Sequence, residues 1–122
     1  AAGQRFLDGL LPDAVLHLAL GPEDWAGLLA AHAGARAIPF VMTSTAMVFD
    51  HDPDGPHAPG DARTAKDGYG QYKIRCEDRV FAANRAAMVA RIGWQIDPDA
   101  RGNNMLAHLD GWQRDQGKVE AS

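Results

Sequence analysis

Two short apolar segments, separated by a stretch with helical spacing, constrain the fold of this chain more than any other feature. Residues 14–19 and 38–45 contain no Asp, Glu, Lys or Arg, and the second segment is rich in β-branched residues. Segments of this length and composition are typical of buried strands. Between them, residues 21–24 combine a proline with two acids, as at a helix start, and Gly34 marks the expected helix end. The pattern predicts a strand–helix–strand unit.

The rest of the chain continues this alternation. Residues 50–65 hold three prolines and two glycines and are expected to form a loop. A helix is expected over residues 66–84, a strand over 87–92, and a helix over 103–116 that Gly117 ends. The residues expected on the buried stripe of the first of these helices are Tyr69, Tyr72, Cys76, Val80 and Phe81. This order predicts an α/β fold, a parallel sheet flanked by helices, and three or four strands suggest a partial sheet.

Composition and charge argue against several classes of protein. Sixteen acidic residues against twelve basic ones give a formal charge of −4, unlike a nucleic-acid binder. No apolar run reaches the ~20 residues of a membrane helix, and no signal peptide opens the chain. The single cysteine, Cys76, fits a reducing compartment. We therefore expect one cytoplasmic domain over residues 1–122, without a nucleic-acid or membrane partner. The start without methionine, and a strand expected from Lys118 at the very end, indicate a piece of a larger protein.

The sharpest chemical pattern consists of Thr45, Tyr69 and Lys73. Tyr69 and Lys73 are four residues apart, which places a phenol and an ammonium on one face of a helix. A nearby cation is expected to lower the pKa of the phenol, and such a tyrosine can exchange a proton with a carbonyl oxygen. Thr45 ends the second strand, at the edge where open α/β sheets bind ligands. A Tyr-x-x-x-Lys pair by itself is also common on solvated helix faces.

Further residues in chain order turn this pattern into a family resemblance. After the strand end at residues 40–50 and the proline-rich loop come Tyr69-Gly70-Gln71-Tyr72-Lys73, Glu77, Arg91-Ile92-Gly93-Trp94 and Gly102-Asn103-Asn104. Together they resemble an extended short-chain dehydrogenase/reductase. Within that superfamily the chain is most similar to the dTDP-4-dehydrorhamnose reductase branch and the related NAD-dependent epimerase/dehydratases. The resemblance covers about residues 12–120.

The resemblance implies a Rossmann-like sheet and an enzyme that transfers hydride between NAD or NADP and a nucleotide-linked 4-keto sugar. In that setting Tyr69 is the general acid/base, Lys73 tunes it, and Thr45 orients the substrate carbonyl. The residues placed at the cofactor are Ala19, Tyr69 and Lys73. The residues placed at the substrate are Thr45, Trp94, Asn103 and Asn104. An epimerase or dehydratase that uses the same Thr45, Tyr69 and Lys73 stays as an alternative, and a homo-oligomer is left open.

The chain departs from the family at the cofactor. The family begins with a strand, a Gly-x-x-Gly-x-x-Gly loop and a helix that binds the pyrophosphate, and nothing here matches them. The segment between Ala19 and Trp25 is also shorter than in the family. We therefore expect a partial NAD(P)-binding domain that, as an isolated chain, binds nucleotide poorly.

A second pattern favours a different class of protein. Asp50, Asp52, Asp54, Gly55 and Asp61 have the spacing of an EF-hand calcium loop. Glutamate normally stands at the last position, prolines stiffen the loop, and the preceding segment is expected to be a strand rather than a helix. An acidic surface loop explains the pattern more simply, so no metal ligand is assigned. A non-catalytic or calcium-binding module stays as the alternative outside the enzymes.

Overall fold

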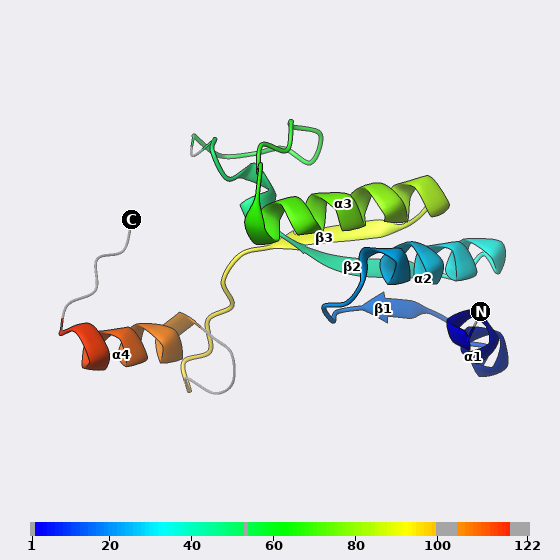
Figure 1. Cartoon of the computed structure of the whole chain (residues 1–122), viewed down its shortest axis with the longest axis horizontal. Helices are drawn as coiled ribbons and strands as arrows, with labels where there is room; N and C mark the ends of the chain where they lie inside the picture. The colour runs from blue at the N-terminus through cyan, green and yellow to red at the C-terminus, as the bar shows by residue number, and fades with distance from the viewer. Residues whose placement is uncertain (1, 53, 100–104, 118–122) are drawn as a thin grey trace. The chain divides into compact units, whose positions relative to one another are not determined.

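The computed structural model describes residues 2–52, 54–99 and 105–117, which fall into two compact units, Ala1–Arg91 and Ile92–Ser122. The elements in chain order are α1 (Ala2–Leu10), β1 (Val15–His17), α2 (Glu23–Ala35), β2 (Phe40–Thr45), the 3-10 helix η1 (Ala46–Phe49), α3 (Gly68–Ala83), β3 (Met88–Ile92) and α4 (Met105–Gln116) (Figure 1). None of the helices in the described ranges is long and apolar enough to cross a membrane. The prediction of one domain over residues 1–122 stays a prediction.

The three strands form one parallel sheet in the order β1-β2-β3 (Figure 1). The register between β1 and β2 pairs Val15 with Phe40, Leu16 with Val41 and His17 with Met42. Because side chains alternate along a strand, His17 and Met42 share one face of the sheet, and both are buried there. Leu16 points to the opposite face and is exposed. The predicted α/β fold with a small parallel sheet and flanking helices is confirmed.

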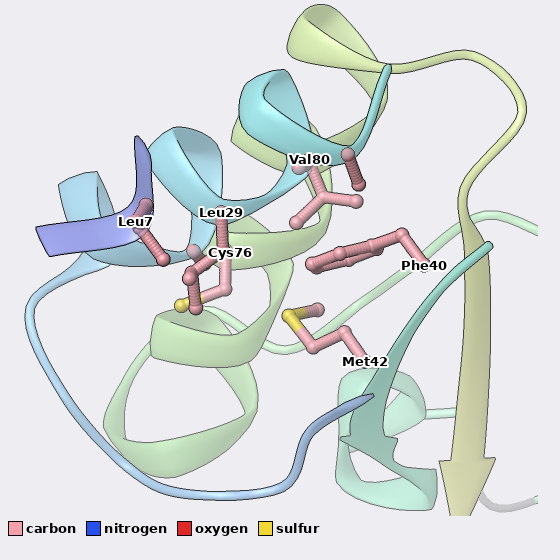
Figure 2. Packing of buried hydrophobic residues seen from close by; sticks show 9 residues of the cluster. Leu7, Leu29, Phe40, Met42, Cys76 and Val80 are labelled. Atoms are coloured by element: carbon pink, nitrogen blue, oxygen red, sulfur yellow. The ribbon is translucent and has the colours of Figure 1, made fainter. Parts of the chain in front are cut away.

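Small residues on α2 allow it to pack closely beside α3 on the sheet. Ala26, Ala30 and Ala33 are fully buried, and a Cβ added at Gly27 would lie 3.4 Å from the Cβ of Arg79 on α3. The buried cluster between helices and sheet consists of Leu7, Ala26, Leu29, Ala30, Ala33, Phe40, Met42, Cys76 and Val80 (Figure 2). This core holds α3 in place over the carboxyl end of β2.

Two helical elements were not expected from the sequence. Helix α1 spans only nine residues, too few for its period to stand out, and it contributes Leu7 to the core. The 3-10 helix η1 follows β2 directly, and its start is capped by the strand's last side chain, Thr45, whose Oγ1 accepts a hydrogen bond from Met47 N at 3.2 Å. Its four residues carry no periodic signal of their own.

The buried stripe of α3 also differs from the expectation. Cys76 and Val80 are buried as expected, but Tyr69 and Phe81 are 41% and 40% exposed. Lys73 and Glu77 are buried in addition, at 3% and 0% exposure. The spacing of the apolar residues does not predict this burial, because the charged side chains of Lys73 and Glu77 occupy the buried face of α3. Both form polar contacts that are described below.

In the second unit, α4 contains no buried residue among those described. Its first residue donates a backbone hydrogen bond, from Met105 N to Gln95 O at 3.1 Å. His108 on α4 lies edge-on to Trp94, with 5.4 Å between the ring centroids. The strand expected from Lys118 lies outside the described residues.

Candidate active site

A glycine lets the first turn of α3 approach the end of β2. A Cβ added at Gly70 would lie well inside contact distance of Met47 O on η1 and 2.8 Å from the Cβ of Ala65. Only glycine fits this contact without a shift of the backbone. Because η1 follows Thr45 directly, the contact holds the start of α3, with Tyr69, beside the strand end. The glycine of the Tyr69-Gly70 pair thus has a structural explanation.

Lys73 is a buried cation near two aromatic rings. Its Nζ donates a hydrogen bond to Thr43 O on β2 at 2.9 Å. The same Nζ lies 5.7 Å from the ring centroid of Tyr69 and 5.8 Å from that of Tyr72, distances at which a cation is attracted to a ring face. Burial lowers the pKa of Lys73, while attraction from Cys76 and Glu77 acts in the opposite direction. The ammonium is therefore fixed to the sheet and to both tyrosines.

Tyr69 is accessible to a ligand, since 41% of its surface is exposed. Burial raises the pKa of its phenol, and the neighbouring Cys76 adds to the increase. The expectation that Lys73 lowers this pKa is therefore wrong for the unliganded chain. The physical reason is that Lys73 is directed to the Thr43 carbonyl, while the partial loss of solvent around Tyr69 disfavours the phenolate. At neutral pH Tyr69 carries its proton.

Thr45 lies at the carboxyl end of β2, where the sequence placed it, and is 7% exposed. Its Oγ1 accepts the hydrogen bond from Met47 N, which orients the hydroxyl group. A hydroxyl that accepts one bond still has its own proton to donate. Thr45 is thus able to donate a hydrogen bond to an oxygen bound at the strand end.

Tyr72 ties the loop after β1 to α3. Its Oη donates a hydrogen bond to Gly21 O at 2.6 Å and accepts one from Gly21 N at 3.2 Å. Ala19, placed at the cofactor by the resemblance, lies exposed in this loop. His17 precedes the loop, and burial followed by repulsion from Lys73 lowers its pKa, so the imidazole is neutral. The sequence does not indicate that Tyr72 binds Gly21, because the two residues are 51 positions apart and such a contact leaves no local pattern.

Tyr72→Phe is expected to lower the free energy of unfolding by about 1–2 kcal/mol, because both hydrogen bonds to Gly21 are lost and the partly buried backbone groups stay unpaired. Urea unfolding followed by circular dichroism measures this change. Tyr69→Phe is the matched control, since it removes the same hydroxyl from the same helix without touching Gly21. Equal destabilisation by both variants would contradict the anchoring role of Tyr72.

The described residues fit one end of a nicotinamide dinucleotide better than the other. An ammonium has three N–H donors, and Lys73 uses one of them for Thr43 O, so it can also donate to ribose hydroxyls beside Tyr69. For the pyrophosphate of the dinucleotide, the described ranges contain no comparable group of binding residues. Helix α2 begins with Glu23 and Asp24, whose carboxylates already occupy that terminus and are paired with Arg75 and Arg79. Only the nicotinamide-ribose end therefore has partners among these residues.

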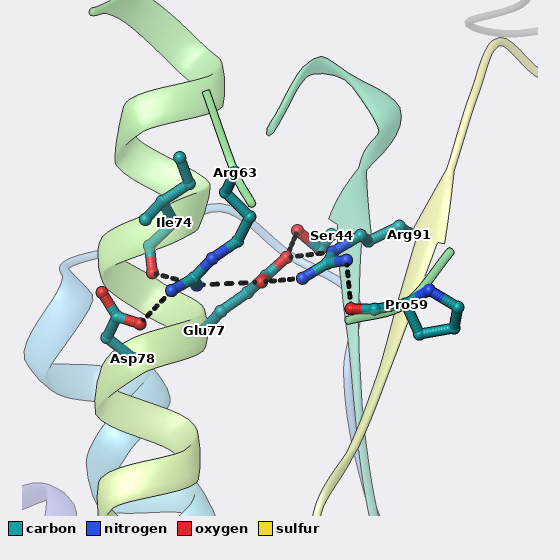
Figure 3. A network of polar contacts seen from close by, with 7 residues as sticks. All are labelled: Ser44, Pro59, Arg63, Ile74, Glu77, Asp78 and Arg91. Atoms are coloured by element: carbon teal, nitrogen blue, oxygen red, sulfur yellow. Dashed lines mark hydrogen bonds and ion pairs between the residues drawn. The ribbon is translucent and has the colours of Figure 1, made fainter. Parts of the chain in front are cut away.

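A buried carboxylate lies one helical turn beyond Lys73. Glu77 is fully buried and accepts hydrogen bonds from Ser44 Oγ at 2.5 Å, Arg63 Nη1 at 3.1 Å, Arg91 Nε at 3.1 Å and Arg91 Nη2 at 2.8 Å (Figure 3). Burial alone raises the pKa of Glu77, but the bonds from Arg91 and Ser44 and the charge of Arg91 outweigh it, and the pKa is lowered. Glu77 therefore stays ionised. The sequence pattern includes Glu77 in the motif but does not indicate which residues bind its carboxylate.

The remaining site residues belong to the second unit or lie outside the described ranges. Trp94, placed at the substrate, is 58% exposed and has His108 as its ring neighbour. Asn103 and Asn104 lie outside the described residues. Their assignment to the substrate stays a prediction.

Asp61, the last aspartate of the EF-hand spacing, has other contacts. Asp61 Oδ2 accepts a hydrogen bond from Ala58 N at 2.7 Å and lies 3.8 Å from His57 Nδ1. His57 itself stacks on Phe49, with 4.2 Å between the ring centroids. In the part of the chain that the structure describes, which omits only Pro53 from this loop, no three His, Cys, Asp or Glu side chains come together in a way that could hold a metal ion.

Comparison with known proteins adds a family and a fold. The model of the RmlD substrate binding domain family matches residues 23–121. A crystal structure of a dTDP-4-dehydrorhamnose reductase, an RfbD ortholog from Clostridium acetobutylicum, matches with a TM-score of 0.77 at 22% sequence identity. The match covers 97% of this chain and 47% of that chain, so this chain spans about half the length of that relative. No curated protein sequence matches. The Rossmann-like α/β fold implied by the resemblance is confirmed.

Proposed function

Since this chain belongs to the RmlD substrate binding domain family, within the dTDP-4-dehydrorhamnose reductase-like branch of the extended short-chain dehydrogenases/reductases, we propose that it contributes the acid–base half of a nucleotide-sugar reductase. The substrate is a nucleotide-linked 4-keto sugar, and the reductant is NADH or NADPH. Tyr69, Lys73 and Thr45 carry the proton chemistry.

The observation that carries this proposal is the position of Lys73. Its ammonium is buried, bound to Thr43 O at the end of β2, and lies 5.7 Å from the ring of Tyr69. A solvated helix face, the simpler explanation of a Tyr-x-x-x-Lys pair, would leave this lysine in water. When the phenol gives up its proton, the ammonium is close enough to attract the phenolate and so to offset part of the effect of burial on it.

The reaction adds two electrons and two hydrogens to the sugar ketone. The reduced nicotinamide, when bound, supplies hydride to the carbonyl carbon. Tyr69 Oη gives its proton to the carbonyl oxygen, which becomes the product hydroxyl, and the C=O π bond breaks as the new C–H and O–H bonds form. Lys73 stabilises the resulting tyrosinate until solvent returns a proton. Thr45 donates a hydrogen bond to the same oxygen and holds it in line with Tyr69.

Support for a reductase over an epimerase or dehydratase of the same superfamily comes from the comparisons, since the matching family is that of the RmlD substrate binding domain and a matching solved structure is that of a dTDP-4-dehydrorhamnose reductase. A Tyr69 phenol that carries its proton fits the role of the acid in that reaction. The proposed substrate side also includes Trp94, Asn103 and Asn104, and the proposed cofactor side includes Ala19.

The test offers the full-length protein NADH or NADPH together with a dTDP-linked 4-keto sugar. We expect oxidation of the nicotinamide that depends on the sugar and yields one alcohol product for each cofactor consumed. The control is the same nucleotide sugar with a hydroxyl in place of the ketone, which offers no carbonyl to reduce. Absence of oxidation with either cofactor, or equal oxidation with the control sugar, would overturn the proposal.

A further inference from the structure

We propose that Glu77 is a positioning residue for the proton transfer: by binding Ser44 it fixes the end of β2 against α3 and so sets the relation of Thr45 and Lys73 to Tyr69. This inference rests on the proposed function and extends it to a residue that does not contact the substrate. Its evidence is the set of contacts between the last residues of β2 and one face of α3.

Two adjacent residues of β2 contact two successive turns of α3. Thr43 O accepts the hydrogen bond from Lys73 Nζ, and Ser44 Oγ donates to Glu77 Oε1 at 2.5 Å. Lys73 and Glu77 are four residues apart, so their Cα atoms are separated by about 6 Å along the helix axis. These two polar contacts add to the apolar core and to the close approach of Gly70, and they attach the last residues of β2 to α3 at two separate points.

The proposed catalytic residues are close in sequence to the residues that form these two contacts. Thr45 is the next residue after Ser44, and Tyr69 is one turn before Lys73 on the same helix. A shift of the strand end therefore changes the relation between the Thr45 hydroxyl and the Tyr69 phenol. A misplacement of about 1 Å can cost roughly 100-fold in rate. The Ser44–Glu77 bond is placed to prevent such a shift.

Glu77 is itself held from three directions. Arg91 from β3 binds both carboxylate oxygens, while its Nη1 donates to Pro59 O at 3.1 Å. Arg63 from the loop after η1 binds Glu77 and also Asp78, at 2.6 Å. Figure 3 shows these side chains converging on Glu77 between α3 and the strands. Because the Glu77 carboxylate is fully buried and bound by two arginines, its position is restrained independently of Ser44. It can therefore restrain the end of β2 through its hydrogen bond with Ser44.

The charge of Glu77 also reaches Lys73, since attraction from Glu77 opposes the effect of burial on the lysine. The ionisable groups near Lys73 are His17 from β1 and Tyr69, Tyr72, Cys76 and Glu77 from α3 itself. Removing the charge of Glu77 makes the ammonium easier to deprotonate. The protonation of Lys73 therefore reports on Glu77 independently of turnover.

The experiment compares Glu77→Gln and Ser44→Ala with Asp78→Asn in the full-length protein. Asp78→Asn is the matched control, because it is the same carboxylate-to-amide change one residue further on, at an exposed partner of the same Arg63. We expect Glu77→Gln and Ser44→Ala each to lower kcat by about tenfold or more, with the KM for the cofactor changed less than about threefold. Ser44→Ala leaves every arginine contact of Glu77 in place, so it decides the question if Glu77→Gln fails to fold.

The pH dependence separates positioning from general stability. Glu77→Gln lowers the pKa of Lys73, so the ammonium loses its proton at lower pH and the alkaline limb of kcat moves to lower pH by about half a unit or more. Asp78→Asn should leave that limb unchanged. Unchanged kcat in Ser44→Ala, or an equal shift of the limb in Asp78→Asn, would overturn the inference.

A measurement without substrate keeps the two proposals apart. NMR titration of Lys73 Nζ follows its pKa in the unliganded protein. If the unsubstituted protein reduces no nucleotide sugar, the proposed function fails. In that case Ser44→Ala, which changes no charge, still tests the inference: a changed Lys73 titration in Ser44→Ala but not in Asp78→Asn supports the attachment of β2 to α3 through Glu77, and identical titrations in both variants reject it.

Discussion

Replacing Tyr69 by phenylalanine is expected to lower kcat for reduction of the keto sugar by about 100-fold to 10,000-fold, the range that a positioned acid contributes. In the proposed mechanism the proton for the carbonyl oxygen comes from the Tyr69 phenol, and the nearby Tyr72 hydroxyl is engaged with Gly21. Thr45 stays able to donate a hydrogen bond, but the pKa of an alcohol is too high for it to supply a proton. Steady-state rates with saturating cofactor and sugar measure the loss.

The KM for each ligand should change little in Tyr69→Phe, because the phenyl ring and its contact with Lys73 remain. Tyr72→Phe serves as the control, since it deletes the same hydroxyl three residues further along α3. Its expected defect is in stability, through the lost bonds to Gly21. A fall in kcat of the same size in both variants would mean that the loss comes from a disturbed helix and not from the chemistry of Tyr69.

Gly70→Ala is expected to lower the free energy of unfolding by about 3 kcal/mol or more, at the upper end for overpacked positions. The added methyl group would lie well inside contact distance of Met47 O and 2.8 Å from the Cβ of Ala65. Neither neighbour is the flexible end of a side chain, so the first turn of α3 must move away from η1. Chemical denaturation followed by circular dichroism measures the change.

Gly9→Ala is the matched control for this substitution. Gly9 lies in α1, and a Cβ there meets nothing within 4 Å. The change should leave stability unchanged or raise it by about 0.5–1 kcal/mol, because alanine loses less conformational freedom than glycine in a helix. If Gly70→Ala is as stable as Gly9→Ala, the close contact between α3 and η1 does not hold the site together.

Apart from α1 and η1, the order of strands and helices could be predicted from the sequence because it depends on local patterns. The apolar run of β2, the acidic start of α2 and the proline-rich loop each indicate their structure over a few residues. Tyr69 and Lys73 share a helix face for the same reason, since a spacing of four fixes it. The position of Thr45 at the carboxyl end of β2 followed once that strand was recognised.

What the sequence did not reveal depends on contacts between distant segments. The bond between Tyr72 and Gly21 joins residues 51 apart, and the carboxylate of Glu77 collects donors from a strand, a loop and another strand. The pKa of Tyr69 also depends on contacts between distant segments. The spacing of four places Lys73 near Tyr69, but the hydrogen bond of Lys73 to Thr43 O and the burial around both side chains form only when β2 packs on α3.

Tyr69, Lys73 and Glu77 follow one another at steps of four along a single helix, and this has a consequence for how the protein can change in evolution. One inserted or deleted residue between any two of them rotates the remainder of α3 by about 100°, which turns one contact away from β2. Substitutions on the outer face of α3 leave this order intact. Changes of length should therefore accumulate in the loop between η1 and α3, whereas the interval from Tyr69 to Glu77 keeps its eight-residue spacing.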